Sequence, residues 1–376
     1  MKLRYKVTGG FLIFVVASLS VLGLVISHNS DCQTTPIAAG SGATMKAVVY
    51  RCYGSPEVLE YTDVAKPTPA DDEVLVKVVA AAVNPLDWHY MRGEPYIIRL
   101  IGAGIGAPTD SRIGVDFAGI VEAVGASVTE YKPGDEVFGG STGAFAQYLT
   151  VRVDRGFAIK PANMSFAHAA SVGIAGVTAI QALRDHGNLQ PGDEVLINGA
   201  SGGVGTFAVQ IAKSMGAVVT GVCSTRNVAM VSALGADHVI DYKKENYIEG
   251  GKKYDVVIDM VGNHSLLSHE DVLTPDGRFV IVGGASGNWL GPLIRPIGAK
   301  LIAPFVDQEF FMIMAILAKS DMEALAELMN SGQLTPVLDK RFKLSETADA
   351  ITYSETGRAR GKIIIEVDQT FANAQL

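Results

Sequence analysis

The clearest pattern of apolar and polar positions lies in residues 193–242. A short apolar run, Val195 to Ile197, follows a Pro-Gly turn and predicts a buried strand. The chain then passes through a glycine-rich turn at 199–205, and from Val204 to Met215 the apolar residues recur at helical spacing. A strand, a glycine turn and a helix in this order predict a cradle for the pyrophosphate of a dinucleotide, because free N–H groups at a helix start bind an anion.

A glycine-rich turn alone also fits an ordinary tight connection between a strand and a helix. The neighbouring pattern favours the dinucleotide site, since further apolar runs at 217–223, 238–241, 255–260 and 278–282 are separated by helical and turn segments. Strands that alternate with helices predict an α/β fold with a parallel, doubly wound sheet.

The segments on either side of this unit follow a different pattern. Short β-like runs at 46–50, 73–83 and 119–124 are separated by turns and predict a mostly β domain. Near the C-terminus the strand–helix alternation stops, so we expect that segment to return to the β domain and complete it. The predicted organisation is an N-terminal anchor and linker at 1–44, a β-rich domain at 45–164 completed by 321–376, and a dinucleotide-binding domain at 165–320.

The N-terminal segment has the pattern of a membrane anchor. Residues 7–26 contain no charge and no proline, they follow Lys2, Arg4 and Lys6, and twenty apolar residues suffice to cross a bilayer. We expect an uncleaved helix with the positive flank in the cytoplasm and the enzyme body on the other side. In the alternative, translation starts at Met45, where a soluble enzyme would begin naturally, and the protein is cytoplasmic.

Composition and net charge narrow the classes of protein to which the chain can belong. The 376 residues are 48% hydrophobic and 19% charged, which is typical of a globular protein with a large core. The net charge of −8 does not favour nucleic-acid binding. Cys32, Cys52 and Cys223 are far apart in sequence and suggest neither a disulfide framework nor a cysteine-rich metal site. The apolar segment 291–318 is interrupted by prolines and charges, and it suits a pocket wall, a subunit contact or ordinary core.

From Met45 to about Asp368 the chain resembles the medium-chain dehydrogenase/reductase superfamily, in its zinc-free quinone oxidoreductase or zeta-crystallin-like branch. The resemblance rests on motifs in the family's order, which are Ala82-Val83-Asn84-Pro85-Leu86-Asp87, Gly114-Val115-Asp116-Phe117-Ala118-Gly119, Gly134-Asp135-Glu136-Val137, Gly176-Val177-Thr178-Ala179, the glycine turn, Leu234-Gly235-Ala236-Asp237 and Arg358-Ala359-Arg360-Gly361-Lys362. It implies a GroES-like β domain packed on a Rossmann domain, an active site between them, and a homodimer.

The resemblance also implies chemistry without zinc. Zinc-dependent members have a cysteine where Asn84 stands and a histidine–glutamate pair where Val115 and Asp116 stand, so the cysteine and the histidine are missing here. We expect hydride transfer to a quinone or another activated α,β-unsaturated carbonyl, which delocalises the incoming charge itself. The alternatives are an enoyl-thioester or alkenal reductase and, in another class, a non-catalytic NADPH-binding protein.

The expected catalytic residues are Asn84, Asp87, His89 and Tyr96. Asn84 and Asp87 match residues near the family's active site, although an Asn-Pro pair also starts turns well. His89 stands where many relatives have a tyrosine, so the identity of any proton donor is open among His89, Tyr96 and water.

The expected cofactor is NADPH. NAD-binding units carry an acid about 20 residues after the glycines, whereas here the second strand is followed by Ser224, Thr225 and Arg226, and an arginine pairs with a 2′-phosphate. Alternatively, Arg226 is a solvated residue at a helix start, and Thr178 bonds only its own backbone. The expected cofactor residues are Thr178, Gly199, Ala200, Gly202, Gly203, Val204, Gly205, Ser224, Thr225, Arg226, Tyr242, Gly283, Arg360 and Lys362.

Overall fold

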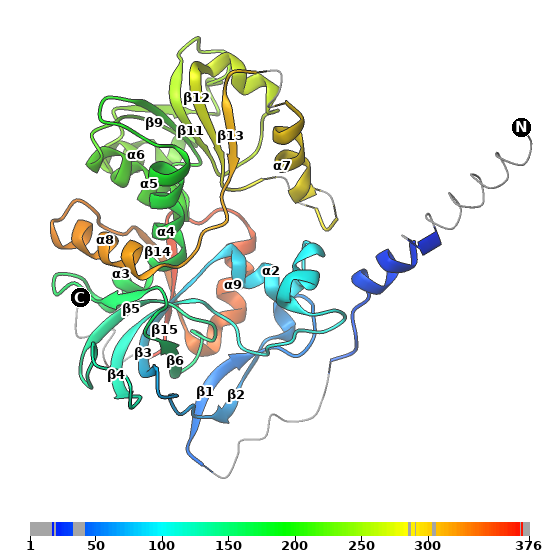
Figure 1. Ribbon diagram of the computed structural model, residues 1–376, viewed down its shortest axis with the longest axis vertical. Helices are drawn as coiled ribbons and strands as arrows, with labels where there is room; N and C mark the ends of the chain where they lie inside the picture. The colour runs from blue at the N-terminus through cyan, green and yellow to red at the C-terminus, as the bar shows by residue number, and fades with distance from the viewer. Residues whose placement is uncertain are drawn as a thin grey trace, which may run out of the picture.

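The computed structural model contains two sheet-based bodies (Figure 1). It describes residues 17–18, 20–32, 42–284, 287–289, 291–302, 306–368 and 370. The body drawn uppermost in Figure 1 is built on a six-stranded sheet whose neighbouring strands are all parallel, in the order β10-β9-β8-β11-β12-β13. The predicted doubly wound α/β sheet is confirmed.

The strands of this parallel sheet alternate with helices along the chain, as the apolar runs predict. Its strands are β8 (Glu194–Asn198), β9 (Val218–Cys223), β10 (His238–Asp241), β11 (Tyr254–Asp259), β12 (Leu273–Ile281) and β13 (Glu309–Met312). Its helices are α4 (Gly173–Gln181), α5 (Gly203–Ser214), α6 (Val228–Ala233) and α7 (Gly291–Ile302). Buried β-branched side chains of the inner strands pack against α4 and α5 in one apolar core.

The second body is mainly antiparallel. Its seven-stranded sheet joins β3 (Glu73–Val83), β4 (Asp116–Val124), β5 (Glu136–Gly140), β6 (Tyr148–Arg152), β7 (Phe157–Ile159), β14 (Leu338–Lys343) and β15 (Lys362–Glu366), while β1 (Thr44–Val49) pairs with β2 (Glu60–Ala65). The C-terminal strand β15 lies antiparallel to β3, with Ile363 opposite Val83. Its helices are α2 (Pro85–Arg92), α3 (Phe166–Ala170), α8 (Lys319–Asn330) and α9 (Thr347–Glu355).

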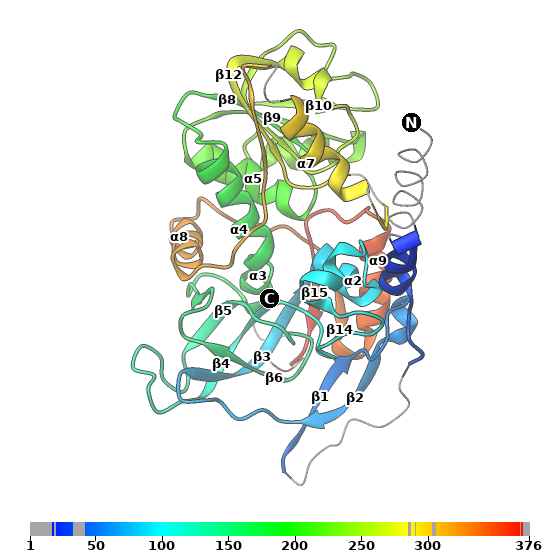
Figure 2. The ribbon, with the colours of Figure 1, turned by 45° about the vertical axis from the view of Figure 1, so that its right-hand side comes forward.

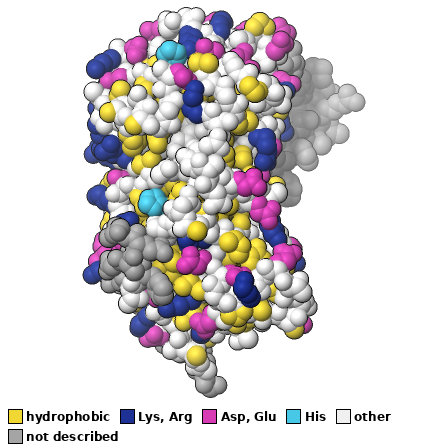
Figure 3. Space-filling view, turned by 90° about the vertical axis from the view of Figure 1, so that its left-hand side faces the viewer, with side chains coloured by type: hydrophobic (Ala, Val, Ile, Leu, Met, Phe, Trp, Pro, Cys, Tyr) yellow, Lys and Arg dark blue, Asp and Glu magenta, His cyan; other side chains and the backbone are white. Residues whose placement is uncertain are grey.

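The pairing of β15 with β3 brings residue 362 next to the end of β3, where Asn84 and α2 begin. This contact joins two parts of the chain that are far apart in sequence, and it decides the composition of the candidate site. On the face shown in Figure 3, acidic and basic side chains are interspersed over both bodies.

The membrane anchor has no support in the structure. The predicted span 7–26 lies partly outside the described residues, which contain a helix over 20–27. None of the helices in the described part of the chain is both long and apolar enough to cross a bilayer.

The cysteine interpretation requires a correction. Cys32 and Cys52 form a disulfide, with their Cα atoms 4.8 Å apart, and only Cys223 is a free cysteine. The two residues meet because the segment after the N-terminal helix folds back against the chain that follows β1. Sequence separation alone does not reveal such a fold-back.

Candidate functional site

The glycine turn connects β8 to α5 and leaves backbone donors free. Gly199 has φ +95°, a conformation that L side chains rarely adopt. A Cβ added to Gly205 would lie 2.1 Å from the Gly199 carbonyl oxygen, so only glycine allows the helix to approach the strand this closely. Gly202 caps α5 without a side-chain hydrogen bond, and the first N–H groups of the helix therefore remain available to an anion. The turn fits a pyrophosphate.

A buried polar cluster lies next to this turn. The Lys362 ammonium donates to Asn84 Oδ1 at 2.6 Å and to Asp116 Oδ2 at 3.2 Å. The Asn84 amide nitrogen donates to the same Asp116 oxygen at 2.9 Å, and Asp116 Oδ1 accepts the backbone N–H of Ile174 at the start of α4. Asn84 is 2% exposed, Asp116 0% and Lys362 3%. Three polar side chains so deeply buried are stable together because each satisfies another.

The cluster and the glycine turn are in direct contact. The backbone N–H of Gly361 donates to the Ser201 carbonyl at 3.1 Å. A Cβ on Gly203 would lie 3.5 Å from Cδ of Lys362, which is an ordinary van der Waals distance. The predicted residues Asn84, Gly203 and Lys362 are thus brought together at the junction of the two bodies.

Asp87 is a buried acid one helical turn from Asn84. Its Oδ2 accepts the Asn84 backbone N–H at 2.7 Å, which completes a capping box at the start of α2. Burial raises the pKa of Asp87 to about 7, and the neighbouring carboxylate of Asp116 acts in the same direction. A substantial fraction of Asp87 is therefore protonated at neutral pH.

His89 is held as a neutral imidazole on the same helix. Its Nδ1 lies 2.7 Å from the Glu94 carbonyl, which can only accept, so Nδ1 carries the proton. Burial lowers the pKa of His89. Both facts argue against His89 as the proton donor.

Tyr96 lies apart from the cluster. Among the described residues no hydrogen bond or ring contact joins it to Asn84 or Asp87. Its ring instead packs edge-on against Trp289 with centroids 4.7 Å apart, and the Arg99 guanidinium lies 4.7 Å from its centroid. The structure thus groups Asn84 and Asp87 and places His89 and Tyr96 farther along the same stretch of chain.

The end of β9 carries the residues expected at the adenosine ribose. Arg226 donates to the carbonyl of Arg358 at 2.7 Å, and no carboxylate of the described residues pairs with its guanidinium. Burial raises the pKa of the Tyr353 phenol, whereas Arg226 and Arg360 both act in the opposite direction, so both positive charges lie near this phenol. This unpaired positive charge suits a phosphate.

The remaining residues around β9 are arranged by side-chain hydrogen bonds. Asn227 donates to Ser201 Oγ at 2.9 Å and to Ser224 Oγ at 3.3 Å, which ties the glycine turn to the end of β9. The Thr225 hydroxyl bonds the Asp241 carboxylate and holds the pKa of that carboxyl below its usual range. Tyr242 is 58% exposed and available for contact with a ligand.

Two predicted cofactor residues have specific structural environments. The Thr178 hydroxyl donates to the carbonyl of Ile174, one helical turn back, as the alternative interpretation expects. Gly283 follows β12, and a Cβ there would lie 2.3 Å from the Met260 carbonyl oxygen. Gly283 therefore keeps the ends of β11 and β12 close together beside the glycine turn.

Sequence reasoning missed a second buried network at this edge of the sheet. The Arg295 guanidinium of α7 lies 2.7 Å from Asp259 Oδ2, with the side chains 8% and 0% exposed. Asp259 Oδ1 accepts from Asn198 Nδ2 at 2.9 Å and from the N–H groups of Val261 and Gly262 at 3.0 Å. Burial alone would raise the pKa of Asp259, but Arg295 and the N–H groups of Gly262 and Val261 lower it. Arg295 looked only like an interruption of an apolar segment.

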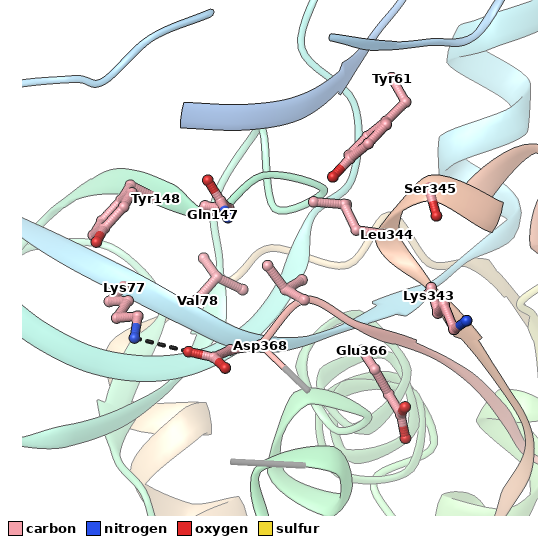
Figure 4. Close-up of a pocket in the computed structure, with 11 residues that line it drawn as sticks. Tyr61, Lys77, Val78, Gln147, Tyr148, Lys343, Leu344, Ser345, Glu366 and Asp368 are labelled. Carbon is pink, nitrogen blue, oxygen red and sulfur yellow. Dashed lines mark ion pairs between the residues drawn. The ribbon is translucent and has the colours of Figure 1, made fainter. Parts of the chain in front are cut away.

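A pocket of about 430 Å³ lies elsewhere, on the antiparallel body (Figure 4). Its residues include Tyr61, Tyr148 and the ion pair between Lys77 and Asp368, whose charged atoms are 2.7 Å apart. None of the predicted site residues lines it, so it is separate from the candidate site.

Comparison with known proteins gives consistent matches to this architecture. Residues 70–162 match the alcohol dehydrogenase GroES-like domain, and residues 234–365 match the zinc-binding dehydrogenase family. The chain is 33% identical to a 2-methylene-furan-3-one reductase of Solanum lycopersicum, over 92% of this chain and 86% of that protein.

Solved structures agree with these matches. The quinone oxidoreductase of Coxiella burnetii superposes with a TM-score of 0.77 at 30% identity, covering 87% of this chain and all of that one. The Escherichia coli quinone oxidoreductase complexed with NADPH gives a TM-score of 0.73 at 26% identity, covering 86% of this chain and 100% of that one.

Proposed function

Because the chain belongs to the medium-chain dehydrogenase/reductase superfamily, in its quinone oxidoreductase branch, we propose that it transfers hydride from NADPH to a quinone or another activated α,β-unsaturated carbonyl. The observation that carries this proposal is the Lys362–Asn84–Asp116 cluster against the glycine turn. It is a buried site with donors and positive charge at the junction of the two bodies.

The residues of this cluster do not fit a zinc ion. Asn84 and Val115 supply neither thiolate nor imidazole, and the Asp116 carboxylate is bonded to Asn84, Lys362 and the N–H of Ile174. The cation that these oxygens bind is the Lys362 ammonium. We therefore propose a hydride transfer without zinc.

The nicotinamide cofactor fits the turn, and we propose NADPH in particular. The unpaired Arg226 and the nearby Arg360 support a 2′-phosphate, and the similar Escherichia coli enzyme was solved with NADPH. When bound, the reduced nicotinamide supplies the hydride. The α5 amides would hold its pyrophosphate, and Ser224 and Arg226 its adenosine end.

The protein's own contribution is orientation and charge. As the conjugated acceptor takes up hydride, at the β-carbon in the case of an enone, negative charge develops on the carbonyl oxygen, and fixed donors stabilise it best where water is excluded. One proton, taken up from solvent, then completes the reduction. Lys362 and Asn84 are the buried donors beside the glycine turn, and we assign them this role. Asp87 fixes the start of α2 and with it the position of Asn84.

The acceptor class is open between quinones and enones. The Coxiella relative is a quinone oxidoreductase, and the tomato relative is named for a methylene group next to a ring ketone. The same hydride step serves both.

The test is NADPH oxidation across a panel of quinones, enones and enoyl thioesters. We expect turnover with at least one class, and NADPH to be preferred over NADH. Tight NADPH binding without turnover on the whole panel would instead identify a non-catalytic NADPH-binding protein.

A further inference from the structure

The N-terminal segment that follows the helix over 20–27 is pinned to the protein at several points. We call residues 26–32 the strap, and residues 93–106, which follow α2, the crossing loop. Ile26 is buried at 5% exposure. The N–H of Ser30 donates to the carbonyl of Gly106 at 2.8 Å, and Cys32 is bonded to Cys52. In Figures 1 and 2 the helix that leads into the strap lies beside the antiparallel body.

Arg99 of the crossing loop is the centre of this contact. It is 3% exposed, and its guanidinium donates to the carbonyls of Ile26 at 2.9 Å and His28 at 3.0 Å and to Asn29 Oδ1 at 2.8 Å. Within its own loop it donates to the Gly93 carbonyl at 2.7 Å. Arg99 therefore caps the end of the N-terminal helix and holds the crossing loop at the same time.

The disulfide closes on the same point. Cys52 precedes Tyr53, whose ring centroid lies 4.3 Å from the Arg99 guanidinium and whose hydroxyl donates to the Gly104 carbonyl at 2.7 Å. The disulfide therefore holds the strap in the place where the Arg99 guanidinium donates hydrogen bonds to the carbonyl oxygens of the strap. Without the strap, three of the acceptors of a buried guanidinium would be lost, which is costly for a charged group.

The crossing loop reaches the dinucleotide-binding body. The N–H of Tyr96 donates to the Asn288 carbonyl, and Asn288 Nδ2 donates to Glu94 Oε1, both at 2.8 Å. Trp289 packs against Tyr96. A Cβ atom added to Gly23 would lie 3.4 Å from the Trp289 ring, so the ring is also close to the N-terminal helix. The loop thus links α2, which carries Asp87 and is capped by Asn84, to the other body, and the N-terminal segment packs against this link.

We propose that Arg99 is a positioning residue and that the strap, held by Cys32–Cys52, fixes the crossing loop at the acceptor side of the site. The proposal rests on the proposed function, because it assigns the loop to acceptor binding rather than cofactor binding. The glycine turn and Arg226 lie on the other body and do not contact the strap in the described residues. Loss of the strap is therefore expected to raise KM for the acceptor and to leave NADPH affinity intact.

The experiment compares the full chain with Cys52→Ser, Arg99→Ala and Arg99→Lys, with the exposed Arg112→Ala as the matched control. Amide hydrogen exchange of residues 93–106 gives a readout that is independent of turnover. We expect exchange there to rise about tenfold in Cys52→Ser and Arg99→Ala. Arg99→Lys retains part of the protection, and Arg112→Ala retains all of it.

In parallel, KM for the acceptor is expected to rise about tenfold in the first two variants, with NADPH Kd changed less than about twofold. If the Cys52→Ser variant does not fold, the Cys32–Cys52 bond of the folded wild-type protein is broken with dithiothreitol instead. Unchanged exchange after reduction, or an equal loss of NADPH affinity, overturns the proposal. Increased exchange in a protein that turns over no acceptor refutes the proposed function and the acceptor-side role, and leaves the strap only as a clamp on the loop.

Discussion

At the scale of single residues, Lys362 is the group on which the proposed chemistry depends most. Replacing it with Met removes the ammonium beside Asn84, and we expect kcat/KM to fall by about 10²–10³ while NADPH Kd changes less than tenfold. The exposed Lys253→Met is the control. Since Asp116 would lose its cation, thermal unfolding is recorded for both variants, and Lys362→Arg tests whether charge alone restores activity. Full activity in a folded Lys362→Met protein contradicts the assignment.

Asp87 makes stability depend on pH. Its folded pKa of about 7 exceeds the ordinary value of 3.8, so the folded state binds more protons between these values, and the free energy of unfolding falls as pH rises through this window. Each pH unit contributes at most about 1.4 kcal/mol. In urea unfolding, we expect the free energy of unfolding of Asp87→Asn to rise relative to that of wild type by about 2 kcal/mol from pH near 5 to pH near 8, because only the wild type loses the contribution of Asp87. The exposed Asp276→Asn serves as control, and equal slopes for all three proteins contradict the prediction.

At the scale of elements, the turn after β9 decides cofactor choice. Within the described part of the chain, Arg226 is bonded only to the Arg358 carbonyl, so its charge is free to pair with a 2′-phosphate. We expect Arg226→Ala to weaken NADPH binding about tenfold to a hundredfold and NADH binding less than threefold, as measured by titration of each cofactor. Equal losses for the two cofactors would show that Arg226 serves the fold and not the phosphate.

A buried ion pair between Arg295 and Asp259 attaches helix α7 to the sheet. Arg295→Met leaves Asp259 as an uncompensated buried carboxylate, and we expect the free energy of unfolding to fall by about 3–5 kcal/mol. Arg112→Met breaks the exposed pair with Asp110 and is expected to cost less than about 1 kcal/mol. The double variant Arg295→Met with Asp259→Asn recovers part of the loss, and no recovery would show that packing of α7, not charge, carries the effect.

At the scale of the whole molecule, the sequence was informative where structure is local. The glycine turn is predictable because φ at Gly199 and the close approach of Gly205 restrict those positions to glycine. The partners of Lys362 are not predictable from spacing, since it is 246 residues from Asp116. Cys32–Cys52 and Arg295–Asp259 likewise depend on how distant segments pack. Asp116 belongs to one of the family motifs, but the residues next to it in sequence do not indicate that its cation is Lys362.

Among the described residues β13 is an edge strand of the parallel sheet, and this edge bears on the assembly of the protein. Met312, Met314 and Ile316 on and just after β13 are 46%, 73% and 72% exposed. An unpaired edge strand with large apolar neighbours is a template for pairing with a second copy, and we propose a homodimer through it.

Sedimentation equilibrium of wild type and of the double variant Met314→Glu with Ile316→Glu tests this assembly. Each apolar side chain contributes about 1.5–3 kcal/mol when buried, so the double substitution is expected to weaken association at least about a hundredfold. Ile159→Glu, which changes an exposed apolar residue of β7 on the other body, is the control and is expected to remain dimeric. If wild type is a monomer, or if both variants dimerise equally well, the pairing of β13 edges is refuted.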